Sequence, residues 1–600
     1  MLKNLLVVFA AWTALLPAQR PTIPVRYSAR GLHGAVAAGS DYATEAGLRI
    51  LHRGGNAVDA GVAATLAAAV TEYSHFGFGG EAPILIRTAQ GKVYSIAGVG
   101  TMPKAATFDY FLKRKLKTEE VYEIEENGLD HMLPTAGLHA ALVPGMVDAV
   151  LVALQEFGSL TFAEVAQPAL ELAQSSPIDE PRVREIQATR HILALWPTSR
   201  AVFLPDGKVP RPGDLFRQPD LARTLQAMIA AEKGPSRKQA IEAVRNFFYR
   251  GDIARRIGDF SKANGGLLRY EDFAAFHLAP EEPVSGNYHG YTVYKPGFWS
   301  QGPSMIEALN ILGLQDLTRF GWNSPEYIHN SVEALKLAYA DRDTWYGDPK
   351  FTPEPRELLS LDYARQRAQL IGPKASAEFR PGLLNGKTGE HPSAHAGKVA
   401  NIDDALMQRD TTCVTAADKD GIVFSSTPSG AWTPAVIAGD TGIPLTQRAQ
   451  SFLLIAGHPN AVAGGKRPRV TLSPTLVTFQ GKPYLALATP GGDNQEQSLL
   501  QVMLDILDFG MNPQQAVEAA RYQTRHLVSS FDNHSMSPAD LILDERMGQA
   551  AQKDLMQRGH RVEVRSRYGS GAAPVAIRIR PNGVIEAGAD PYGYRSAVAW

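Results

Sequence analysis

Segments with helical periodicity alternate with short apolar runs along the first two thirds of the chain. Residues 41–53 repeat apolar positions at helical spacing and stop at Gly54-Gly55, which predicts a helix. A second helix is predicted from Asn56 through Ala67, and residues 84–86 predict a buried strand. Helical patterns dominate residues 145–371.

The pattern changes to strands after residue 410. Three hairpins are predicted, and helices are predicted after Pro490-Gly491-Gly492 and from Asn512-Pro513. Between the two regions, residues 379–410 have weak periodicity and many glycines and prolines, which predicts an exposed linker. Hairpins alternating with long helices indicate a layered α+β fold. The predicted hairpin strands are 413–417 with 422–426, 476–479 with 484–488, and 575–579 with 584–587.

The N-terminus has the layout of a signal peptide. Lys3 precedes an apolar run over residues 5–16, and Pro17-Ala18-Gln19 ends it. The run is short for a bilayer span, and the alternatives are a buried strand or an uncleaved anchor. No later apolar run is long enough for a membrane helix. We therefore expect residues 1–19 to be removed and the mature protein to be exported, periplasmic or extracellular, with no membrane span.

Composition excludes several classes of protein. Lys plus Arg is 60 and Asp plus Glu is 61, so the balance favours no nucleic-acid partner. Cys413 is the single cysteine, which excludes an internal disulfide or a multi-cysteine metal site. Residues 382–388 resemble a phosphate loop but are one residue short, and His391 and His395 lack a convincing helix. We therefore predict neither a metal nor a cofactor.

A hydroxyl residue stands where the predicted linker meets the first predicted strand, in Asp410-Thr411-Thr412. Hydroxyl groups are weak nucleophiles without an adjacent base. If the chain is cut before Thr411, the freed α-amine can accept a proton, because its ordinary pKa is about 7.7–8.0. Taken alone, a Thr-Thr pair is also ordinary for a β-strand.

The surrounding segments favour the catalytic interpretation. Residues 411–430 resemble the small-subunit start of the γ-glutamyltranspeptidase family, whose members are N-terminal nucleophile hydrolases that cleave themselves before a threonine. Other segments resemble the same family in the same order and cover nearly the whole mature chain. They are Gly54-Gly55-Asn56-Ala57-Val58-Asp59-Ala60, Val143-Pro144-Gly145, Ala338-Tyr339-Ala340-Asp341-Arg342, Ser473-Pro474-Thr475, Pro490-Gly491-Gly492 and Gly588-Ala589-Asp590-Pro591.

The resemblance implies an α+β fold of the four-layer αββα type. It implies a large-subunit segment, residues 20–410, and a small-subunit segment, residues 411–600, which associate after self-cleavage between Asp410 and Thr411. Thr411 corresponds to the nucleophile, and Ser429 to a second hydroxyl that hydrogen-bonds it. Gly491 and Gly492 match the oxyanion glycines, where backbone N–H groups at a helix start approach a tetrahedral oxyanion.

The γ-glutamyl pocket departs from the family pattern. The positions of an arginine, an asparagine and an aspartate are occupied here by Val99, Ala431 and Ser451. These residues cannot supply the two charges that an α-amino acid head group requires. The family's serine pair falls at Val470-Thr471, which keeps one hydroxyl.

New cations appear near this pocket. Arg448 and Arg469 are candidates for pairing with an acidic acyl group, unless they are surface or ion-paired residues. These segments look more like the family's divergent members, including oxamate amidohydrolase-like and cephalosporin acylase-like proteins. The predicted substrate-binding residues are Arg448, Arg469 and Thr471.

The resulting hypothesis is a self-processing hydrolase that cleaves a small-molecule amide through an acyl-enzyme on Thr411. It transfers the acyl group to water or an amine. One alternative is a true γ-glutamyltransferase or glutathione hydrolase. An alternative of another class is an unprocessed, non-catalytic binding protein with the same fold.

Overall fold

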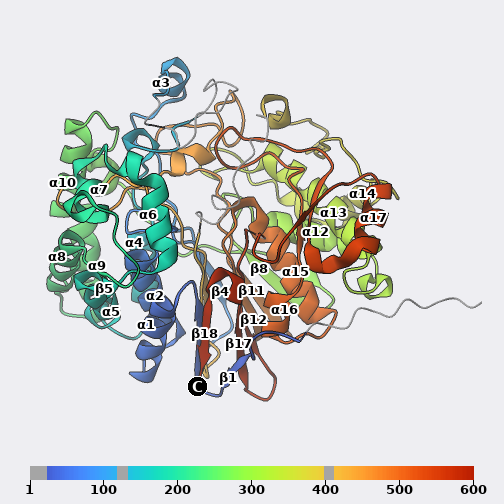
Figure 1. Cartoon of the computed structure of the whole chain (residues 1–600), viewed down its shortest axis with the longest axis horizontal. Helices are drawn as coiled ribbons and strands as arrows, with labels where there is room; N and C mark the ends of the chain where they lie inside the picture. Colours follow the sequence, from blue (N-terminus) through green and yellow to red (C-terminus); the bar gives the residue numbers. More distant parts are fainter. Residues whose placement is uncertain (1–22, 118–119, 121–132, 397–410, 570) are drawn as a thin grey trace, which may run out of the picture.

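Two antiparallel sheets packed face to face form the centre of the molecule (Figure 1). The computed structural model describes residues 23–117, 120, 133–396, 411–569 and 571–600. The predicted signal peptide, Asp410 and the predicted linker from residue 397 onward lie outside these residues. The described part of the predicted linker, residues 379–396, is a surface loop with one short 3-10 turn, η6 (Pro392–His395).

The first sheet has six strands, and the second has seven. The order in the first is β18 (Ser596–Ala599), β2 (Gly34–Ala38), β9 (Val414–Asp418), β10 (Val423–Ser426), β3 (Ile84–Arg87) and β4 (Val93–Ile96). The order in the second is β1 (Ala29–Gly31), β17 (Ile585–Ala589), β16 (Val575–Ile579), β12 (Lys482–Ala488), β11 (Thr475–Phe479), β8 (Tyr291–Lys295) and β7 (Val284–Tyr288).

Small side chains let the two sheets approach closely. Ala417 of β9 and Ala486 and Ala488 of β12 lie in one buried cluster between the sheets. Ser425 Oγ of β10 donates to the Leu487 carbonyl of β12 at 2.8 Å, which joins the two sheets directly. Because side chains alternate along a strand, Val414 and Ala416 point the other way and pack under the helices. The strand that follows Thr411 is therefore covered on both faces.

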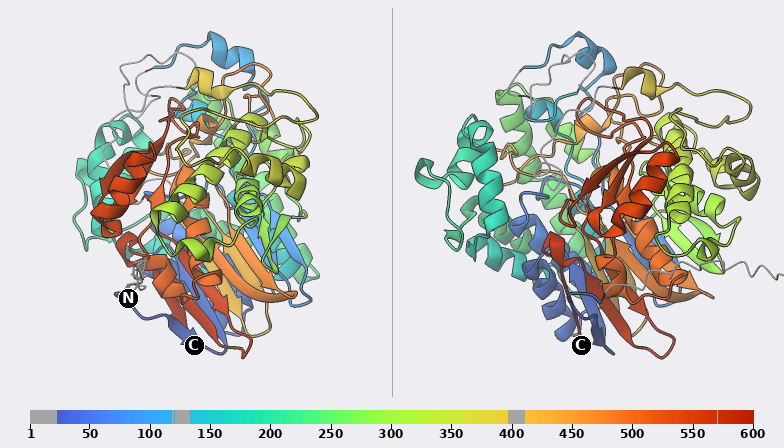
Figure 2. Two further views of the ribbon diagram at one scale, coloured as in Figure 1. Left: turned by 90° about the vertical axis from the view of Figure 1, so that its right-hand side faces the viewer. Right: turned by 45° about the vertical axis from the view of Figure 1, so that its right-hand side comes forward.

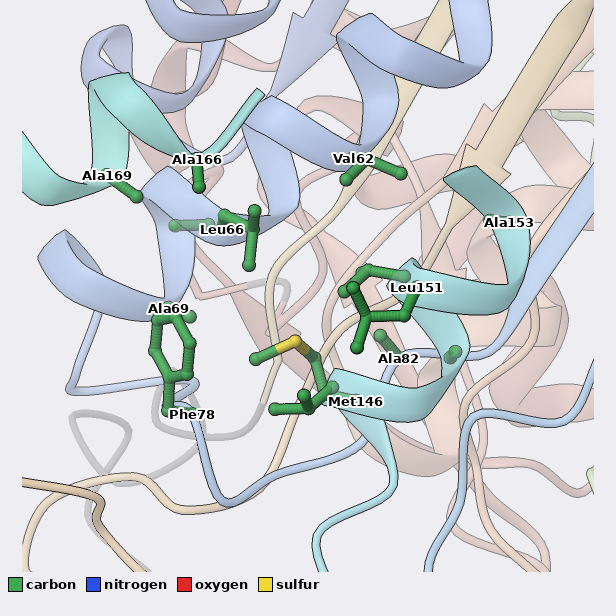
Figure 3. Close-up of a cluster of buried hydrophobic side chains, with 14 of the residues drawn as sticks. Val62, Leu66, Ala69, Phe78, Ala82, Met146, Leu151, Ala153, Ala166 and Ala169 are labelled. Carbon is green, nitrogen blue, oxygen red and sulfur yellow. The ribbon is translucent and has the colours of Figure 1, made fainter. Parts of the chain in front are cut away.

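Helices α1 (Asp41–His52), α2 (Ala57–Thr71), α4 (Met146–Phe157) and α5 (Phe162–Gln174) cover the outer face of the six-stranded sheet. Asn56 caps α2 in a capping box with Asp59. Every residue of α2 is buried, and its alanines and Gly61 let it lie close to Phe424 of β10. Val62 and Leu66 share a cluster with Met146 and Leu151 of α4 (Figure 3).

Helices α12 (Pro303–Leu312), α13 (Pro325–Trp345), α15 (Gln495–Leu507) and α16 (Pro513–Glu518) cover the seven-stranded sheet. The predicted four-layer αββα arrangement is thereby confirmed. A lobe beside α4 and α5 consists of α6 (Glu180–Leu193), α7 (Pro197–Phe203), α8 (Pro219–Ala230), α9 (Arg237–Tyr249), α10 (Asp252–Ala263) and α11 (Tyr270–Ala274). Outside the layers lie α3 (Phe108–Lys113), α14 (Leu361–Ala368) and α17 (Gly548–Gln557), with strands β13 (Tyr522–Gln523), β14 (Asp540–Asp544) and β15 (Arg561–Arg565).

The predicted helices 41–53 and 56–67 and the three predicted hairpins are confirmed. The helical interpretation of residues 145–371 was incomplete, because it contains the hairpin β7–β8. His289 and Gly290 form its turn with φ of 49° and 88°, a left-handed pair typical of two-residue hairpins. Among the described residues, none of the helices is both long and apolar enough to cross a membrane.

Strands from both sides of residue 410 are interleaved in both sheets (Figure 2). In the first sheet, β2 lies between β18 and β9, so an early strand is flanked by two late ones. In the second, β8 pairs with β11 and β1 pairs with β17. A cut at residue 410 would leave two chains joined by three strand pairings across the first sheet and two across the second.

The protein is expected to lose stability as the pH falls below about 6.5. His526 contacts the Glu378 carbonyl and His560 contacts His329, both across the two segments. Burial, followed by the charge of Lys336, lowers the pKa of each ring to about 3. The unfolded state therefore binds more protons between pH 6.5 and 3. Each histidine should cost about 1 kcal/mol of unfolding free energy per pH unit in that window.

Denaturant unfolding at pH 7, 5.5 and 4.5 measures this loss. His526→Gln and His560→Gln should each reduce the slope of the unfolding free energy against pH, by an amount that corresponds to about one proton. His191→Gln, at an exposed position of α6, is the matched control and should leave it unchanged. Equal slopes for all three variants would contradict the assignment.

Candidate active site

Thr411 lies just before β9 and is fully buried. It forms an isolated antiparallel bridge with Ser429, and its Oγ1 lies 3.2 Å from Ser429 Oγ. The Thr412 N–H donates to the Pro428 carbonyl at 2.8 Å and fixes the register of this bridge. The structure therefore brings together the two hydroxyls that the sequence singled out.

Arg448 approaches the same pair of hydroxyls from another loop. It begins the 3-10 turn η8 (Arg448–Ser451), and its Nη2 donates to Ser429 Oγ at 2.6 Å. Ser429 is held in place by Glu81, because the two residues exchange backbone hydrogen bonds of 2.7 and 2.8 Å. A guanidinium thus lies one hydrogen bond behind the hydroxyl that contacts Thr411.

Glu81 is also the counter-ion of Arg448. Arg448 Nε donates to Glu81 Oε2 at 3.1 Å, and neither side chain is exposed. The guanidinium stacks between Trp432 and Phe531, at 5.1 and 5.9 Å from the ring centroids. Within the described part of the chain, Arg448 Nη1 is buried and has no hydrogen-bond partner. This nitrogen is an available donor in an otherwise satisfied arginine.

Gly491 and Gly492 form the turn between β12 and α15. Gly491 has φ 118° and Gly492 φ 54°, values that favour glycine. A Cβ at Gly491 would lie 2.7 Å from the Gly571 carbonyl oxygen. The 3-10 turn η9 (Gly492–Asn494) runs directly into α15, so the positive end of the helix lies at these glycines. The turn can present backbone N–H groups to an oxyanion.

A buried polar network holds this turn. Gln301 Nε2 donates to the Gly492 carbonyl at 2.9 Å, and Arg342 Nη1 donates to Gln301 Oε1 at 2.8 Å and to Asp493 Oδ1 at 2.6 Å. The Ser530 backbone and hydroxyl also donate to Asp493. Burial acts to raise the pKa of Asp493, but Arg342 and then Arg469 lower it below its ordinary value. Asp493 is therefore ionised and fixed.

The two remaining predicted binding residues lie near this network. Arg469 is buried, donates to Ser530 Oγ at 2.8 Å and lies 3.6 Å from Asp343 Oδ1. The charge of Arg469 is therefore balanced by Asp343, which agrees with the alternative that this arginine is an ion-paired residue. The Thr471 carbonyl accepts from Gln301 Nε2, which also bonds Gly492, and Thr471 Oγ1 is buried with no partner among the described residues. Thr471 is thus placed beside the glycine turn.

The pocket positions that depart from the family pattern carry no charge in the structure. Val99 belongs to the apolar cluster under α2 and α4. Ala431 is buried with φ 55°, next to Gly77. Ser451 is buried and its carbonyl accepts from Asn460 Nδ2 at 2.6 Å. Arg448 supplies a cation at the Thr411–Ser429 pair, through its hydrogen bond to Ser429.

The two residues after Thr411 have other surroundings. Thr412 Oγ1 donates to Glu72 on the helix side of the strand. Cys413 Sγ lies 3.9 Å from the Ala573 carbonyl, and burial raises the pKa of its thiol to about 12. A thiol that stays protonated is a poor nucleophile, so Thr411 is the better candidate.

Glu81 and Gln301 are two members of this site that sequence reasoning missed. Glu81 follows Gly79-Gly80, whose close approach to Ser429 and Pro444 leaves no room for side chains. The Gly79-Gly80 pair indicated in the sequence that two backbone segments approach closely here. It did not indicate that Glu81 would pair with Arg448. Gln301 had no signal in the sequence.

Comparisons with known proteins cover almost the entire chain. A family model described as Gamma-glutamyltranspeptidase matches residues 43–600. The chain is 34% identical over 569 residues to a glutathione hydrolase-like YwrD proenzyme from Bacillus subtilis (strain 168), covering 93% of this chain and 96% of that protein. It is 32% identical over 564 residues to an acylase ACY 1 proenzyme from Pseudomonas sp. (strain V22), covering 93% and 92%.

A solved structure has the same architecture. The cephalosporin acylase from Bacillus halodurans superimposes with a TM-score of 0.80 at 27% identity, covering 99% of both chains. The matches in sequence and structure both extend across residue 410. The family match over residues 43–600 therefore spans the Thr411–Ser429 pair and the glycine turn.

Proposed function

We propose that Thr411 is the nucleophile of this chain, which belongs to the γ-glutamyltranspeptidase family. With Thr411 the chain cleaves itself and then hydrolyses amides. The family is self-processing and transfers acyl groups. The contact of 3.2 Å between Thr411 Oγ1 and Ser429 Oγ, backed by Arg448, is the observation that carries the assignment.

Self-cleavage begins with attack of Thr411 Oγ1 on the carbonyl carbon of Asp410. The peptide C–N bond breaks, an ester forms at Oγ1, and the Thr411 nitrogen takes a proton to become an amine. Water then hydrolyses the ester, releasing the Asp410 carboxylate and restoring the hydroxyl. The products are residues 20–410 and 411–600, once residues 1–19 have been removed on export. The interleaved sheets would keep them together.

In turnover, the new α-amine accepts the Thr411 hydroxyl proton as Oγ1 attacks the substrate amide. The oxyanion forms opposite the Gly491 and Gly492 N–H groups, which the Gln301 and Asp493 contacts hold rigid. Collapse expels the amine, which takes a proton, and leaves an acyl ester on Thr411. Water, or a second amine, then attacks this ester and releases the acyl group.

The preferred acyl group carries a carboxylate and no α-ammonium. Val99, Ala431 and Ser451 provide no ionic partners for an amino acid head group. Arg448 has one unpartnered nitrogen within the described part of the chain, suited to a carboxylate. Glu81 already balances Arg448 and accepts from Thr446, so it is engaged rather than free for an ammonium group. Anionic acyl amides are therefore proposed over γ-glutamyl compounds.

Release of p-nitroaniline by the purified, cleaved protein tests the function. Glutaryl-p-nitroanilide should be hydrolysed faster than γ-glutamyl-p-nitroanilide, and Thr411→Ala is the blank. Faster hydrolysis of γ-glutamyl-p-nitroanilide would instead support the alternative that the protein is a true γ-glutamyltransferase or glutathione hydrolase. An intact chain that stays uncut for days would support the non-catalytic binding protein instead.

Removing the Arg448–Glu81 pair is expected to abolish the preference for anionic acyl groups. The double variant Arg448→Gln/Glu81→Gln removes both buried charges together, so neither is left unpaired. The ratio of kcat/KM for glutaryl- over butyryl-p-nitroanilide should fall by about 10-fold or more, since these substrates differ only in a terminal carboxylate. An unchanged ratio would place the acyl carboxylate elsewhere.

A further inference from the structure

Self-cleavage would make Thr411 the first residue of a chain, ahead of the regular part of strand β9. The ladder of β9 begins at Val414, which pairs with Ala38 of β2. Residues 411–413 therefore precede the ladder. Chain ends are poorly ordered unless neighbouring contacts tie them down. The contacts of residue 412 are for this reason important for the position of the nucleophile after the cut.

Thr412, the residue after the nucleophile, is anchored through its backbone and its side chain. Its N–H donates to the Pro428 carbonyl at 2.8 Å, and its Oγ1 donates to Glu72 Oε2. Both Thr412 and Glu72 are fully buried. A hydrogen bond in the protein interior is electrostatically stronger than one in water, so the contact with Glu72 is a firm anchor for this strand start.

Glu72 is itself held in place on several sides. It follows α2, a helix in which every residue is buried, and its N–H donates to the Ala68 carbonyl at 2.8 Å. Its own carbonyl accepts from the N–H groups of His75 and Phe76 at 2.7 and 2.9 Å. Its second carboxyl oxygen, Oε1, accepts from Ser40 Oγ at 2.7 Å. The carboxyl group is thereby fixed between the end of α2 and the start of α1.

The backbone that follows β2 leaves room for this contact because residue 39 is glycine. A Cβ at Gly39 would lie 1.8 Å from Thr412 Oγ1 and 2.3 Å from Glu72 Oε2. Arg182 Nη2 of α6 lies 4.0 Å from the same Oε2. The hydroxyl and the carboxyl group thus meet in a closely packed place, where any larger residue at position 39 would separate them.

One short segment, residues 72–81, carries two buried carboxyl groups that support the nucleophile. Glu81, at its end, acts through the arginine that donates to the Ser429 hydroxyl. Glu72, at its start, acts through the residue that follows Thr411. The segment therefore contributes both to the partner of the Thr411 hydroxyl and to the strand that carries Thr411.

We propose that Glu72 is a positioning residue for turnover, which holds the new chain start through the Thr412 hydroxyl so that Thr411 Oγ1 stays at Ser429. The inference rests on the proposed function, in which Thr411 becomes a chain terminus. Before the cut, peptide bonds restrain Thr411 on both sides. After the cut, the bond to residue 410 is gone and the position of Thr411 depends more strongly on this contact. Misplacement of a reacting group by about 1 Å can cost about 100-fold in rate.

Thr412→Val tests this proposal, because valine has nearly the shape of threonine and lacks the hydroxyl. Its kcat for the anilide should fall about 10-fold or more, with KM within about twofold, since the substrate does not contact residue 412. Self-cleavage, followed by denaturing intact-mass analysis of freshly purified protein over time, should slow by less than about threefold. Unequal effects on the two reactions would not arise from a general loss of stability.

Thr412→Ser and Thr415→Val are the matched controls. Thr412→Ser keeps a hydroxyl toward Glu72 and should keep kcat within about threefold. Thr415 is also buried, but it lies within the ladder of β9, where its hydroxyl donates to the Ala37 carbonyl at 3.1 Å. Thr415→Val should therefore keep the wild-type kcat, although it loses a buried hydrogen bond as well.

A double-mutant cycle tests whether Glu72 acts through Thr412. Glu72→Gln should lower kcat more than self-cleavage, as Thr412→Val does. The double variant should be no slower than the slower single variant, because both changes break the same contact. If Glu72→Gln fails to fold, the comparison of Thr412→Val with Thr412→Ser still tests the proposal.

Three outcomes would overturn the proposal. They are a normal kcat in Thr412→Val, an equal loss of kcat and of self-cleavage in that variant, and losses of kcat that add in the double variant. Wild-type protein that is not cut before Thr411, or anilide hydrolysis that survives Thr411→Ala, would instead count against the proposed function.

Discussion

Thr411→Ala is expected to leave one uncut chain and to reduce amide hydrolysis by about 10⁴-fold or more. The substitution removes the oxygen that attacks Asp410 and, in turnover, the oxygen that carries the acyl group. It removes a small polar group at a fully buried position, so the fold should persist. Denaturing intact-mass analysis over several days, with an anilide assay on the same sample, measures both effects.

Cys413→Ala is the matched control for this experiment. Cys413 is equally buried and, like Thr411, lies just before β9, but burial holds the pKa of its thiol near 12 and its Sγ contacts the Ala573 carbonyl. The variant should be cut before Thr411 at the normal rate. Normal cleavage of Thr411→Ala, or loss of cleavage in Cys413→Ala, would move the nucleophile away from Thr411.

Local features of the fold could be predicted from the sequence because neighbouring residues determine them. Asn56 caps α2 through residues three positions away, and the hairpin β9–β10 closes through its own turn. The contact between Thr411 and Ser429 spans 18 residues and follows from the same hairpin, since both residues flank its strands. The hairpin β7–β8 was missed because its turn is His289-Gly290, and not one of the Asn-Gly, Asp-Gly or Gly-Gly pairs that most strongly indicate a two-residue hairpin.

The electrostatics of the site could not be predicted in the same way. Arg448 was a candidate, but its counter-ion Glu81 lies 367 residues away and is placed by pairing between distant loops. Arg469 and Arg448 look alike in sequence, yet one is tied to Asp343 and Ser530 while the other contacts Ser429. Which buried cation reaches the nucleophile depends on tertiary packing rather than on local pattern.

Gly491→Ala is expected to lower kcat for the anilide by about 100- to 1000-fold, the usual effect of losing one oxyanion donor. At φ 118° an alanine is strained, and its Cβ would lie 2.7 Å from the Gly571 oxygen, so the turn must shift. The N–H groups of residues 491 and 492 would then no longer meet the oxyanion. Self-cleavage passes through a similar tetrahedral state and should slow as well.

Gly510→Ala separates this effect from ordinary backbone strain. Gly510 also has a positive φ, 67°, but an added Cβ would meet nothing within 4 Å. That variant should lose about 1 kcal/mol of stability and keep its kcat within about twofold. If Gly491→Ala also kept its kcat, the oxyanion would have to be stabilised elsewhere. A selective loss at Gly491 would instead link the rate to the turn that Gln301, Arg342 and Asp493 hold in place.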